Sequence, residues 1–292
     1  MADTLIIGHS GKLGAELHRQ LNARGCDVAS LDREDCDLRS ADAVREAIVA
    51  REPDRVFNAA AYNDVDGAES DEHAAFDVNA MGPARVAAAC REVGATLVQF
   101  STDYVFGDGH DTPIDESAEP APLSTYGRSK LVGERLVRQN RPGNFVIRTT
   151  GLYGRRRSNF IKSMIRHALA GTTLQVVDDE TLSPTWVRPL ADRAIAISET
   201  GVYGTYHAVS QGGCSWYDFT AEIFETLELE ADLSPTAADA WNAEADRPGY
   251  SVLDNRMLRL VGVDPMPDWR ESLRAFLAEH GSELIDELDG GK

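Results

Sequence analysis

The sequence predicts an α/β fold built on a doubly wound parallel sheet, with a smaller lobe formed by C-terminal residues. Through the first half of the chain, short β-rich runs alternate with amphipathic helical stretches, which is the pattern of βαβ units. The 292 residues, 42% of them hydrophobic, are enough for one large domain or two closely joined ones. The 24 glycines and 12 prolines are spread along the chain, which excludes low-complexity and collagen-like classes.

The first half of the chain accounts for five strands and four helices. Strands are expected at Thr4–Ile7, Asp27–Leu31, Arg55–Ala59, Thr96–Ser101 and Phe145–Thr149. Helices are expected at Leu13–Arg24, Ala41–Arg51, His73–Val93 and Tyr126–Gln139. Three of these helices have a stop signal directly after them, namely Gly25, Gly94 and the run Arg141-Pro142-Gly143.

Beyond residue 150 the alternation is less regular. Helices are expected at Phe160–Ala170 and Pro189–Thr200, and strands at Leu174–Val177 and Gly204–Val209. We therefore expect residues 1–150, with a return segment at about 189–228, to form the sheet domain. Residues 151–188 and 229–285 would form the lobe, and the polar end Gly281–Lys292 is expected to fray.

Charge and hydropathy exclude several classes of function. The 48 acidic residues against 29 basic ones leave a net charge of −19, which disfavours a nucleic-acid partner. No run approaches the roughly 18 apolar residues of a membrane span, and no leader-like segment precedes the first strand. The four cysteines, at positions 26, 36, 90 and 214, lack a CxxC pair, so we expect reduced thiols in a cytoplasmic protein without a membrane partner.

The basic residues are unusual in kind, because only four of them, at positions 12, 130, 162 and 292, are lysines. An acid-rich, lysine-poor surface resembles that of proteins from salt-accumulating cytoplasms, where concentrated cations screen self-repulsion. An ordinary acidic protein is the alternative interpretation. We expect halophilic adaptation.

A glycine-rich turn directly follows the first strand and opens a helix. Its spacing is GxxGxxG, formed by Gly8, Gly11 and Gly14. In this context glycines allow a tight turn and a close approach of the backbone to a pyrophosphate. Asp32 ends the second strand, 18 residues past Gly14, where a carboxylate would accept hydrogen bonds from a ribose. The sequence thus predicts a Rossmann-type dinucleotide site, and the neighbouring Arg33 leaves both NADH and NADPH open.

A second motif joins a phenol and an ammonium group on one helix. Tyr126 and Lys130 are four residues apart, so they project from the same face. A nearby cation favours the phenolate of a tyrosine, whose reference pKa is ~10. Thr102 follows the fourth strand, at the sheet edge where doubly wound folds bind substrates.

Together these motifs resemble the extended short-chain dehydrogenase/reductase family. Within it the similarity is closest to dTDP-4-dehydrorhamnose reductases, over roughly residues 4–277. The motifs that carry the resemblance are Asn58–Tyr62, Val65–Glu69, Val78–Ala80, Ser101–Phe106, Tyr126–Glu134, Arg148-Thr149, Asn159-Phe160, Ser183–Thr185, Gly204–Tyr217, Arg247-Pro248 and Leu253-Asp254.

The resemblance implies NAD(P)H-dependent reduction of the 4-keto group of dTDP-4-dehydro-6-deoxy-L-mannose to dTDP-L-rhamnose. Tyr126 would donate the proton, Thr102 would hold the keto oxygen, and Lys130 would orient the nicotinamide ribose and lower the pKa of Tyr126. The implied cofactor-binding residues are Gly8, Ser10, Gly11, Lys12, Leu13, Gly14, Asp32, Arg33, Asp37, Leu38, Ala59, Ala60, Ala61, Tyr62, Asn79, Tyr126 and Lys130. The implied substrate-binding residues are Asp64, Val65, Asp103, Tyr104, Asn159 and Arg247.

One position departs from the family pattern. Many such reductases carry a tryptophan beside the sugar where this chain has Gly151, which leaves the exact sugar open. A nucleotide-sugar epimerase or dehydratase with tightly bound NAD is an alternative from the same superfamily. A non-catalytic subunit resembling the regulatory subunit of methionine adenosyltransferase is another, although the intact Thr102, Tyr126 and Lys130 argue against it. The resemblance is compatible with a homodimer.

Three other groups of residues invite a functional interpretation. Arg155, Arg156 and Arg157 would either anchor a substrate diphosphate or form a solvated charge run, which we favour. The carboxylates of Asp64, Asp66 and Glu69 could suggest a metal site, but such residues in a polar loop are more often solvated, and no metal is expected. His9 is expected in a loop near the cofactor and His207 in a structural strand position.

Overall fold

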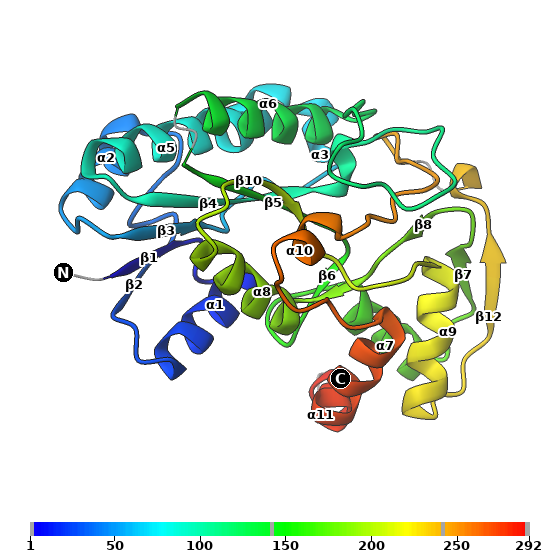
Figure 1. Ribbon diagram of the computed structural model, residues 1–292. Coiled ribbons are helices and arrows are strands. Elements are labelled where there is room, and N and C mark those ends of the chain that lie inside the picture. The colour runs from blue at the N-terminus through cyan, green and yellow to red at the C-terminus, as the bar shows by residue number, and fades with distance from the viewer. Residues whose placement is uncertain (1–2, 141–142, 241–242, 290–292) are drawn as a thin grey trace.

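Six parallel strands form the central sheet in the order β10-β5-β4-β3-β1-β2 (Figure 1). The computed structural model describes residues 3–140, 143–240 and 243–289. The strands of this sheet are β1 (Thr4–Ile7), β2 (Val28–Leu31), β3 (Arg55–Asn58), β4 (Thr96–Thr102), β5 (Phe145–Thr149) and β10 (Gly204–His207). The prediction of a doubly wound parallel sheet is confirmed. Strand order reverses between β1 and β3, so ligands are expected at the carboxyl ends of these two strands.

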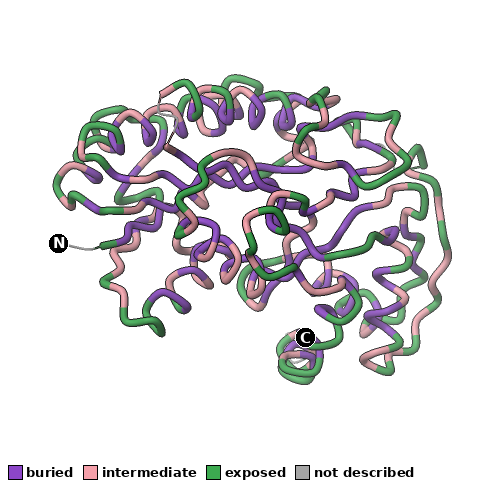
Figure 2. Tube along the Cα trace, viewed as in Figure 1, coloured by how far each residue is buried: buried purple, intermediate pink, exposed green. Residues whose placement is uncertain are grey.

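Helices cover both faces of the sheet, and the sequence of β1 shows why. In a strand, successive side chains point to opposite faces. Leu5 and Ile7 pack into one core, under α2 (Ala41–Val49) and α5 (Gly82–Val93). Ile6 packs into the other core, toward α1 (Lys12–Ala23) and α8 (Val187–Glu199). α6 (Thr125–Asn140) lies beside α5 on the first face (Figure 1), and Figure 2 shows the buried sheet between the two layers.

The helix expected at His73–Val93 is interrupted. The structure has α4 (Glu72–Phe76), a π-helical turn at Asp77–Met81 and then α5, which ends at Gly94 with φ 81°. Pro83 has no N–H to donate to the carbonyl of Asn79, so the ordinary i to i+4 ladder cannot continue there. A π-helical register accommodates this break, and such turns are frequent at functional sites.

The C-terminal lobe is built from short paired strands and four helices. It lies at the end of the sheet, on the lower right in Figure 1. β6 pairs with β9, β12 with β7, and β11 with β8. Its elements are β6 (Leu152–Tyr153), α7 (Phe160–Leu169), β7 (Leu174–Val177), β8 (Thr181–Leu182), β9 (Thr185–Trp186), β11 (Cys214–Ser215), α9 (Trp216–Leu227), β12 (Leu233–Thr236), α10 (Arg256–Leu260) and α11 (Trp269–Asp289). The short helix α3 (Gly67–Ser70) is not part of the lobe and lies beside the sheet.

Two sequence-based expectations for this region need correction. Part of the expected return segment, α9, packs against α7 and α11 instead of the sheet. The expected fraying from Gly281 is wrong within the described residues, because α11 continues to Asp289. Gly281 and Leu284 are buried, and a Cβ at Gly281 would lie 2.5 Å from Leu227 Cδ2 of α9. Close packing against α9 therefore holds the last turns of α11, although their sequence is polar.

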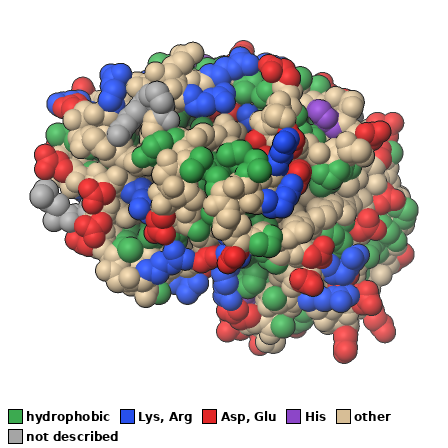
Figure 3. Space-filling model, in the orientation of Figure 1, with side chains coloured by type: hydrophobic (Ala, Val, Ile, Leu, Met, Phe, Trp, Pro, Cys, Tyr) green, Lys and Arg blue, Asp and Glu red, His purple; other side chains and the backbone are tan. Residues whose placement is uncertain are grey.

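Charged side chains are distributed over the face of the molecule seen in Figure 3, with basic groups mostly beside acidic ones. Several are explicit pairs, such as Arg45 with Glu92 at 2.5 Å and Arg188 with Glu279 at 2.5 Å. Among the described residues, no helix is long and apolar enough to cross a membrane.

Candidate active site

The glycine-rich turn lies at the carboxyl end of β1 and packs closely against its surroundings. Gly8 has φ 87°, and a Cβ there would lie 2.7 Å from the backbone nitrogen of Ala60. A Cβ on Gly14 would lie only 2.2 Å from the carbonyl oxygen of Gly8. Both positions therefore require glycine. The resulting backbone cradle at the start of α1 fits a dinucleotide pyrophosphate, with Ser10 to Gly14 around it.

Asp32 lies beside this turn at the end of β2. Its Oδ1 accepts a hydrogen bond of 2.8 Å from the backbone N–H of Ser10. Arg33 is exposed, and its nearest carboxylate is Asp37, at 3.9 Å. The hydrogen bond from Arg39 lowers the pKa of Asp37 to about 2. Asp32 is thus oriented by the turn, whereas Arg33 points into solvent.

The residues expected along the inner edge of the cofactor directly follow β3, the neighbour of β1 in the sheet. Ala59, Ala60 and Ala61 follow β3, and Gly8 contacts Ala60 directly. Leu38 is buried against Gly82 at the start of α5. The structure therefore brings these positions to the same edge of the sheet as the glycine-rich turn.

Thr102, Tyr126 and Lys130 converge in a buried cluster between β4 and α6. Their exposed fractions are 7%, 9% and 5%. The Thr102 hydroxyl donates to Asp103 Oδ1 at 2.9 Å and accepts from the N–H of Tyr104 at 3.2 Å. The rings of Tyr104 and Tyr126 meet edge to face, with centroids 5.8 Å apart.

α6 reaches this cluster because two of its glycines touch neighbouring backbone. A Cβ on Gly127 would lie 2.1 Å from the carbonyl oxygen of Tyr104, and a Cβ on Gly133 would lie 2.1 Å from that of Asn79. The helix is also held at its start. The Glu69 carboxylate accepts from the N–H and the hydroxyl of Thr125, both at 2.7 Å. Glu69 is therefore a helix-capping group here.

Lys130 is buried, and its ammonium group donates to the carbonyl oxygen of Phe100 at 2.8 Å. Burial lowers the pKa of Lys130 to about 8, and the charge of Glu134 opposes this effect. Removing an ammonium group from water disfavours its charged form. Keeping the ammonium group of Lys130 charged in this buried place therefore lowers the free energy of unfolding.

Tyr126 differs from the expectation based on Lys130 alone. Burial raises the pKa of its phenol, the charge of Asp103 raises it further, and a hydrogen bond with Thr102 opposes both. The direction is opposite to that expected because desolvation of the buried phenol disfavours its charged form. The phenol is consequently in the protonated form that a proton donor needs.

Asn79, in the π-helical turn, links the residues after β3 to α6. Its Oδ1 accepts from the N–H of Tyr62 at 2.9 Å, and its Nδ2 donates to the carbonyl of Tyr62 at 3.0 Å. The same Nδ2 lies 3.1 Å from Ser129 Oγ, whose hydroxyl donates to the carbonyl of Tyr126 at 2.7 Å. Sequence reasoning missed Ser129, although its spacing of three residues from Tyr126 could have indicated it.

Asp103, expected at the substrate, lies behind Thr102. It is 2% exposed, and its Oδ2 accepts from the Ser251 hydroxyl at 2.7 Å. Burial raises the pKa of Asp103, while the hydrogen bonds from Ser251, Thr150 and Thr102 oppose this shift. Its carboxylate therefore orients the Thr102 hydroxyl.

Arg247 of the lobe reaches across to the loop after β3. It forms a two-pronged pair with Asp66, at 2.8 and 3.2 Å, which lowers the pKa of that carboxyl. Glu180, which the sequence did not indicate, is half-buried nearby. Burial raises the pKa of Glu180, and the charge of Arg247 opposes it. Burial raises the pKa of Tyr104, and the charges of Arg247 and Glu180 also act on it, so these groups lie near the cluster of Thr102, Tyr126 and Lys130.

The other expected substrate residues have local structural partners. Asp64 accepts from the N–H of Gly67 at 2.9 Å, and Val65 packs partly buried beside Tyr104. Asn159 caps α7 through the N–H of Lys162 and donates to the carbonyl of Gly154. Asn159 therefore positions the loop between β6 and α7.

Gly151 stands where a family tryptophan was expected. It has φ 55°, and a Cβ there would lie 3.1 Å from Leu182 Cδ1 and from Pro184 Cα. Both the backbone and the space favour glycine. A side chain at this position would require Leu182 and Pro184 to shift.

A buried ion pair fixes α6 to β5 behind the cluster. Arg148 donates to both oxygens of Glu134, at 2.9 and 2.7 Å, and both side chains are almost fully buried. His207 lies beside Arg148 with its Nδ1 bonded to the carbonyl of Ile114. Burial and the charge of Arg148 lower the pKa of His207 to about 3, so it is a neutral core residue.

The arginine run and the histidine of the turn are also placed. Arg155 pairs with Glu287 of α11 at 2.5 Å, and Arg157 contacts Ser10 in the glycine-rich turn. Arg155 and Arg157 therefore have protein partners, unlike the solvated charge run that we favoured from the sequence. The ring of His9 lies 4.8 Å from that of His18 on α1.

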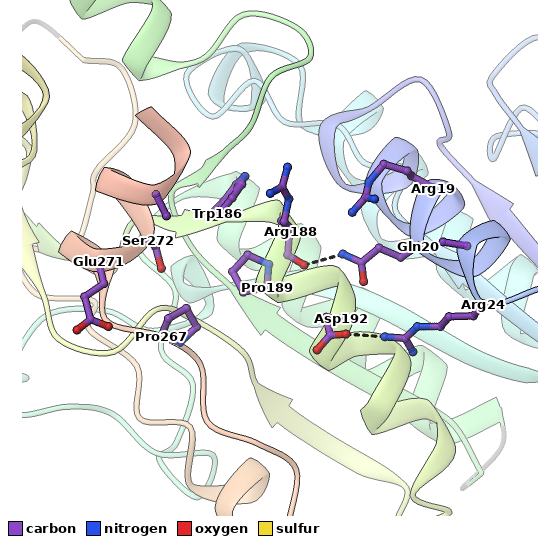
Figure 4. A pocket seen from close by; sticks show the side chains of 12 residues that line it. Arg19, Gln20, Arg24, Trp186, Arg188, Pro189, Asp192, Pro267, Glu271 and Ser272 are labelled. Carbon is purple, nitrogen blue, oxygen red and sulfur yellow. Dashed lines mark hydrogen bonds and ion pairs between the residues drawn. The ribbon is translucent and has the colours of Figure 1, made fainter. Parts of the chain in front are cut away.

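A pocket of about 640 Å³ opens elsewhere, between α1, α8 and the start of α11 (Figure 4). Gln20 and Arg24 of α1 bond across it to Arg188 and Asp192 of α8. None of the expected site residues line it.

Comparisons with known proteins agree with this geometry. The family model described as the RmlD substrate binding domain matches residues 2–282. The chain belongs to this family. It is 41% identical to a dTDP-4-dehydrorhamnose reductase of Streptomyces griseus, over 92% of this chain and 91% of that protein. It is also 41% identical to a probable dTDP-4,6-dihydroxy-2-methyloxan-3-one 4-ketoreductase of Streptomyces antibioticus, over 92% of each chain.

A solved structure of the same family is closely superimposable. The dTDP-4-dehydrorhamnose reductase of Bacillus anthracis, in complex with NADP, is 37% identical with a TM-score of 0.92, over 96% of this chain and all of that one. This agreement extends over both the sheet domain and the lobe.

Proposed function

We propose that this protein is an NAD(P)H-dependent reductase of nucleotide-linked 4-keto sugars, which converts dTDP-4-dehydrorhamnose to dTDP-L-rhamnose. The observation that carries the proposal is the buried cluster of Thr102, Tyr126 and Lys130 beside the glycine-rich turn. The two Streptomyces relatives, named for 4-keto reduction of dTDP-linked substrates, support the same reaction class.

The chain's own groups account for the proton and for the orientation of the substrate. A bound nicotinamide would supply the hydride. Tyr126, kept protonated by burial, donates its proton to the oxygen of the former keto group. The Thr102 hydroxyl, oriented by Asp103, holds that oxygen, and the ammonium group of Lys130 stabilises the tyrosinate left after transfer.

The lobe formed by residues 151–188 and 229–285 is proposed as the substrate-binding unit. Arg247 carries a positive charge to the edge of the catalytic cluster, where Tyr104 and Glu180 also lie. A nucleotide diphosphate would be attracted to this arginine. The packing around Gly151 gives the sugar a different neighbour from the tryptophan of related reductases.

The direct test supplies purified protein with dTDP-4-dehydrorhamnose and follows the absorbance of NADH or NADPH, in dilute buffer and in about 1 M KCl, where charges are screened. We expect one NAD(P)H oxidised per sugar reduced. An epimerase or dehydratase would retain bound NAD and consume no NAD(P)H. A regulatory subunit would neither retain NAD nor consume NAD(P)H. Either result would refute the proposal.

The setting of the protein is a proposal as well. Cys26, Cys36 and Cys214 are free thiols, and Cys36 and Cys214 are buried, which suits a reducing cytoplasm. The homodimer stays a prediction, and light scattering in about 1 M KCl checks it, because at that salt surface repulsion is screened.

A further inference from the structure

Two cations from different parts of the chain meet at the glycine-rich turn. Arg157, in the loop between β6 and α7, donates from Nε to the carbonyl of Ser10 at 2.9 Å and from Nη2 to its hydroxyl at 2.5 Å. Lys12, in the first turn of α1, donates to the carbonyl of Ser158 at 3.2 Å. The loop and the turn are thus joined by reciprocal contacts.

These two cations have no counter-ion in the described part of the chain. Among residues 3–140, 143–240 and 243–289, neither Lys12 nor Arg157 forms an ion pair, whereas the neighbouring Arg155 pairs with Glu287. Burial and the charge of Arg157 both lower the pKa of Lys12. In a chain of net charge −19, two uncompensated cations side by side favour the binding of an anion.

The backbone conformation of Arg157 also supports a binding role for this residue. Its φ is 58°, in the left-handed region that non-glycine residues adopt at a cost of about 1–2 kcal/mol. The hydrogen bonds to Ser10 use Nε and Nη2 only, so the Nη1 donors of the guanidinium are available to a ligand. Strain of this kind persists where the surroundings, and often a function, maintain it.

The hydrogen bonds of Ser10 indicate which phosphate group of a dinucleotide these cations would bind. Its N–H donates to Asp32, the carboxylate that ends β2 and is expected to face the adenosine ribose. Arg157 bonds to the carbonyl and the hydroxyl of Ser10, so Arg157 and Asp32 contact the same residue of the turn. Arg33 points into solvent near Asp37, so it is a weaker candidate than Arg157 for binding a phosphate beside Ser10.

We propose that Arg157, assisted by Lys12, binds the 2′-phosphate of NADPH and offsets its repulsion by Asp32. This inference rests on the proposed dinucleotide function and names the residue that sets the choice of dinucleotide. It predicts that the contact is specific for the 2′-phosphate, because the guanidinium enters beside Ser10 and Asp32.

The test compares dissociation constants for NADPH and NADH, measured by tryptophan fluorescence without any sugar present. Arg157→Asn removes the charge and keeps a residue that tolerates the left-handed conformation. Its neighbour Arg156, which is also exposed, supplies the matched control Arg156→Asn. Adenosine 2′,5′-bisphosphate and AMP serve as fragment probes that differ only in the 2′-phosphate.

We expect Arg157→Asn to weaken NADPH and adenosine 2′,5′-bisphosphate roughly tenfold or more, the scale of a charge-assisted hydrogen bond. NADH and AMP should change less than about twofold, and Arg156→Asn should leave all four affinities near wild type. Equal losses for NADPH and NADH, or no loss for either, would overturn the inference. Failure to reduce the dTDP sugar would instead refute the proposed activity, since binding is measured independently of it.

Discussion

Replacing Lys130 by methionine should make the protein more stable while abolishing its proposed activity. Methionine keeps the length of the side chain but removes the charge. The lysine pKa falls from 10.5 to about 8, a difference of about 2.5, which corresponds to about 3 kcal/mol of unfavourable desolvation. The hydrogen bond to Phe100 is lost, at about 1 kcal/mol. That carbonyl still accepts from Gln99 Nε2 at 2.8 Å, so no buried acceptor is left unpaired.

The expected gain is therefore about 2 kcal/mol near pH 7, where Lys130 is charged in both folded and unfolded states. Between about pH 8 and 10.5 the folded wild type loses this proton while the unfolded chain retains it. The stability of the wild type then rises relative to the variant, and the advantage of Lys130→Met shrinks toward zero or below.

Urea denaturation followed by tryptophan fluorescence at pH 7, 8, 9 and 10 measures this difference. Other groups titrate in the same range, including Cys36, whose pKa burial raises to about 11. They are common to both proteins and cancel when the free energies of unfolding are subtracted. A variant less stable than wild type at pH 7, or a difference that does not change with pH, would refute the reasoning.

Three further predictions concern the proton donor, the network behind it and the surface. Tyr126→Phe should lower kcat by ~10²–10⁴ with cofactor affinity nearly unchanged, because only the transferable proton is lost; Tyr203→Phe, at a surface tyrosine 46% exposed, is the control. Asn79→Ala should lower the free energy of unfolding in urea by about 3 kcal/mol, because it removes three hydrogen bonds of a buried side chain, while Asn63→Ala at an exposed asparagine costs little. Melting temperature and activity should rise between ~0.01 and ~1 M KCl as surface repulsion is screened.

Each of these has an outcome that contradicts it. A phenylalanine variant retaining more than about a tenth of the wild-type kcat would remove Tyr126 from the proton transfer. Equal effects of the two asparagine substitutions would show that the hydrogen bonds of Asn79 contribute nothing to the free energy of unfolding. Sucrose at matched osmolality separates screening from solvent exclusion, and equal stability in dilute buffer would end the halophilic interpretation.

The sequence predicts best the features that depend on local pattern. Strand β1 and the start of α2 fall where the sequence pattern placed them, because a short apolar run and a cap such as Ser40 are local signals. The π-helical turn follows from Pro83, but its consequence for Asn79 depends on Tyr62 and Ser129, far away in the chain. Helix propensity alone therefore predicted one continuous helix.

Long-range contacts explain the remaining differences. The polar end of α11 looks disordered in sequence, and only the contact of Gly281 with Leu227 shows why it stays helical. Motifs identified Tyr126 and Lys130, but the direction of the Tyr126 pKa depends on burial, which the motif does not contain. Arg157 belongs to a run of three similar residues, and its distinct position appears only through Ser10.

The close packing of α6 has a consequence for how this enzyme family can diversify. Gly127 and Gly133 touch neighbouring backbone, and Glu134 is locked to Arg148 in the core, so small drifts of this helix are blocked along its length. A side chain at Gly127 or Gly133 would displace α6, and with it Tyr126 and Lys130. Changes of sugar specificity are therefore expected at residues outside this helix.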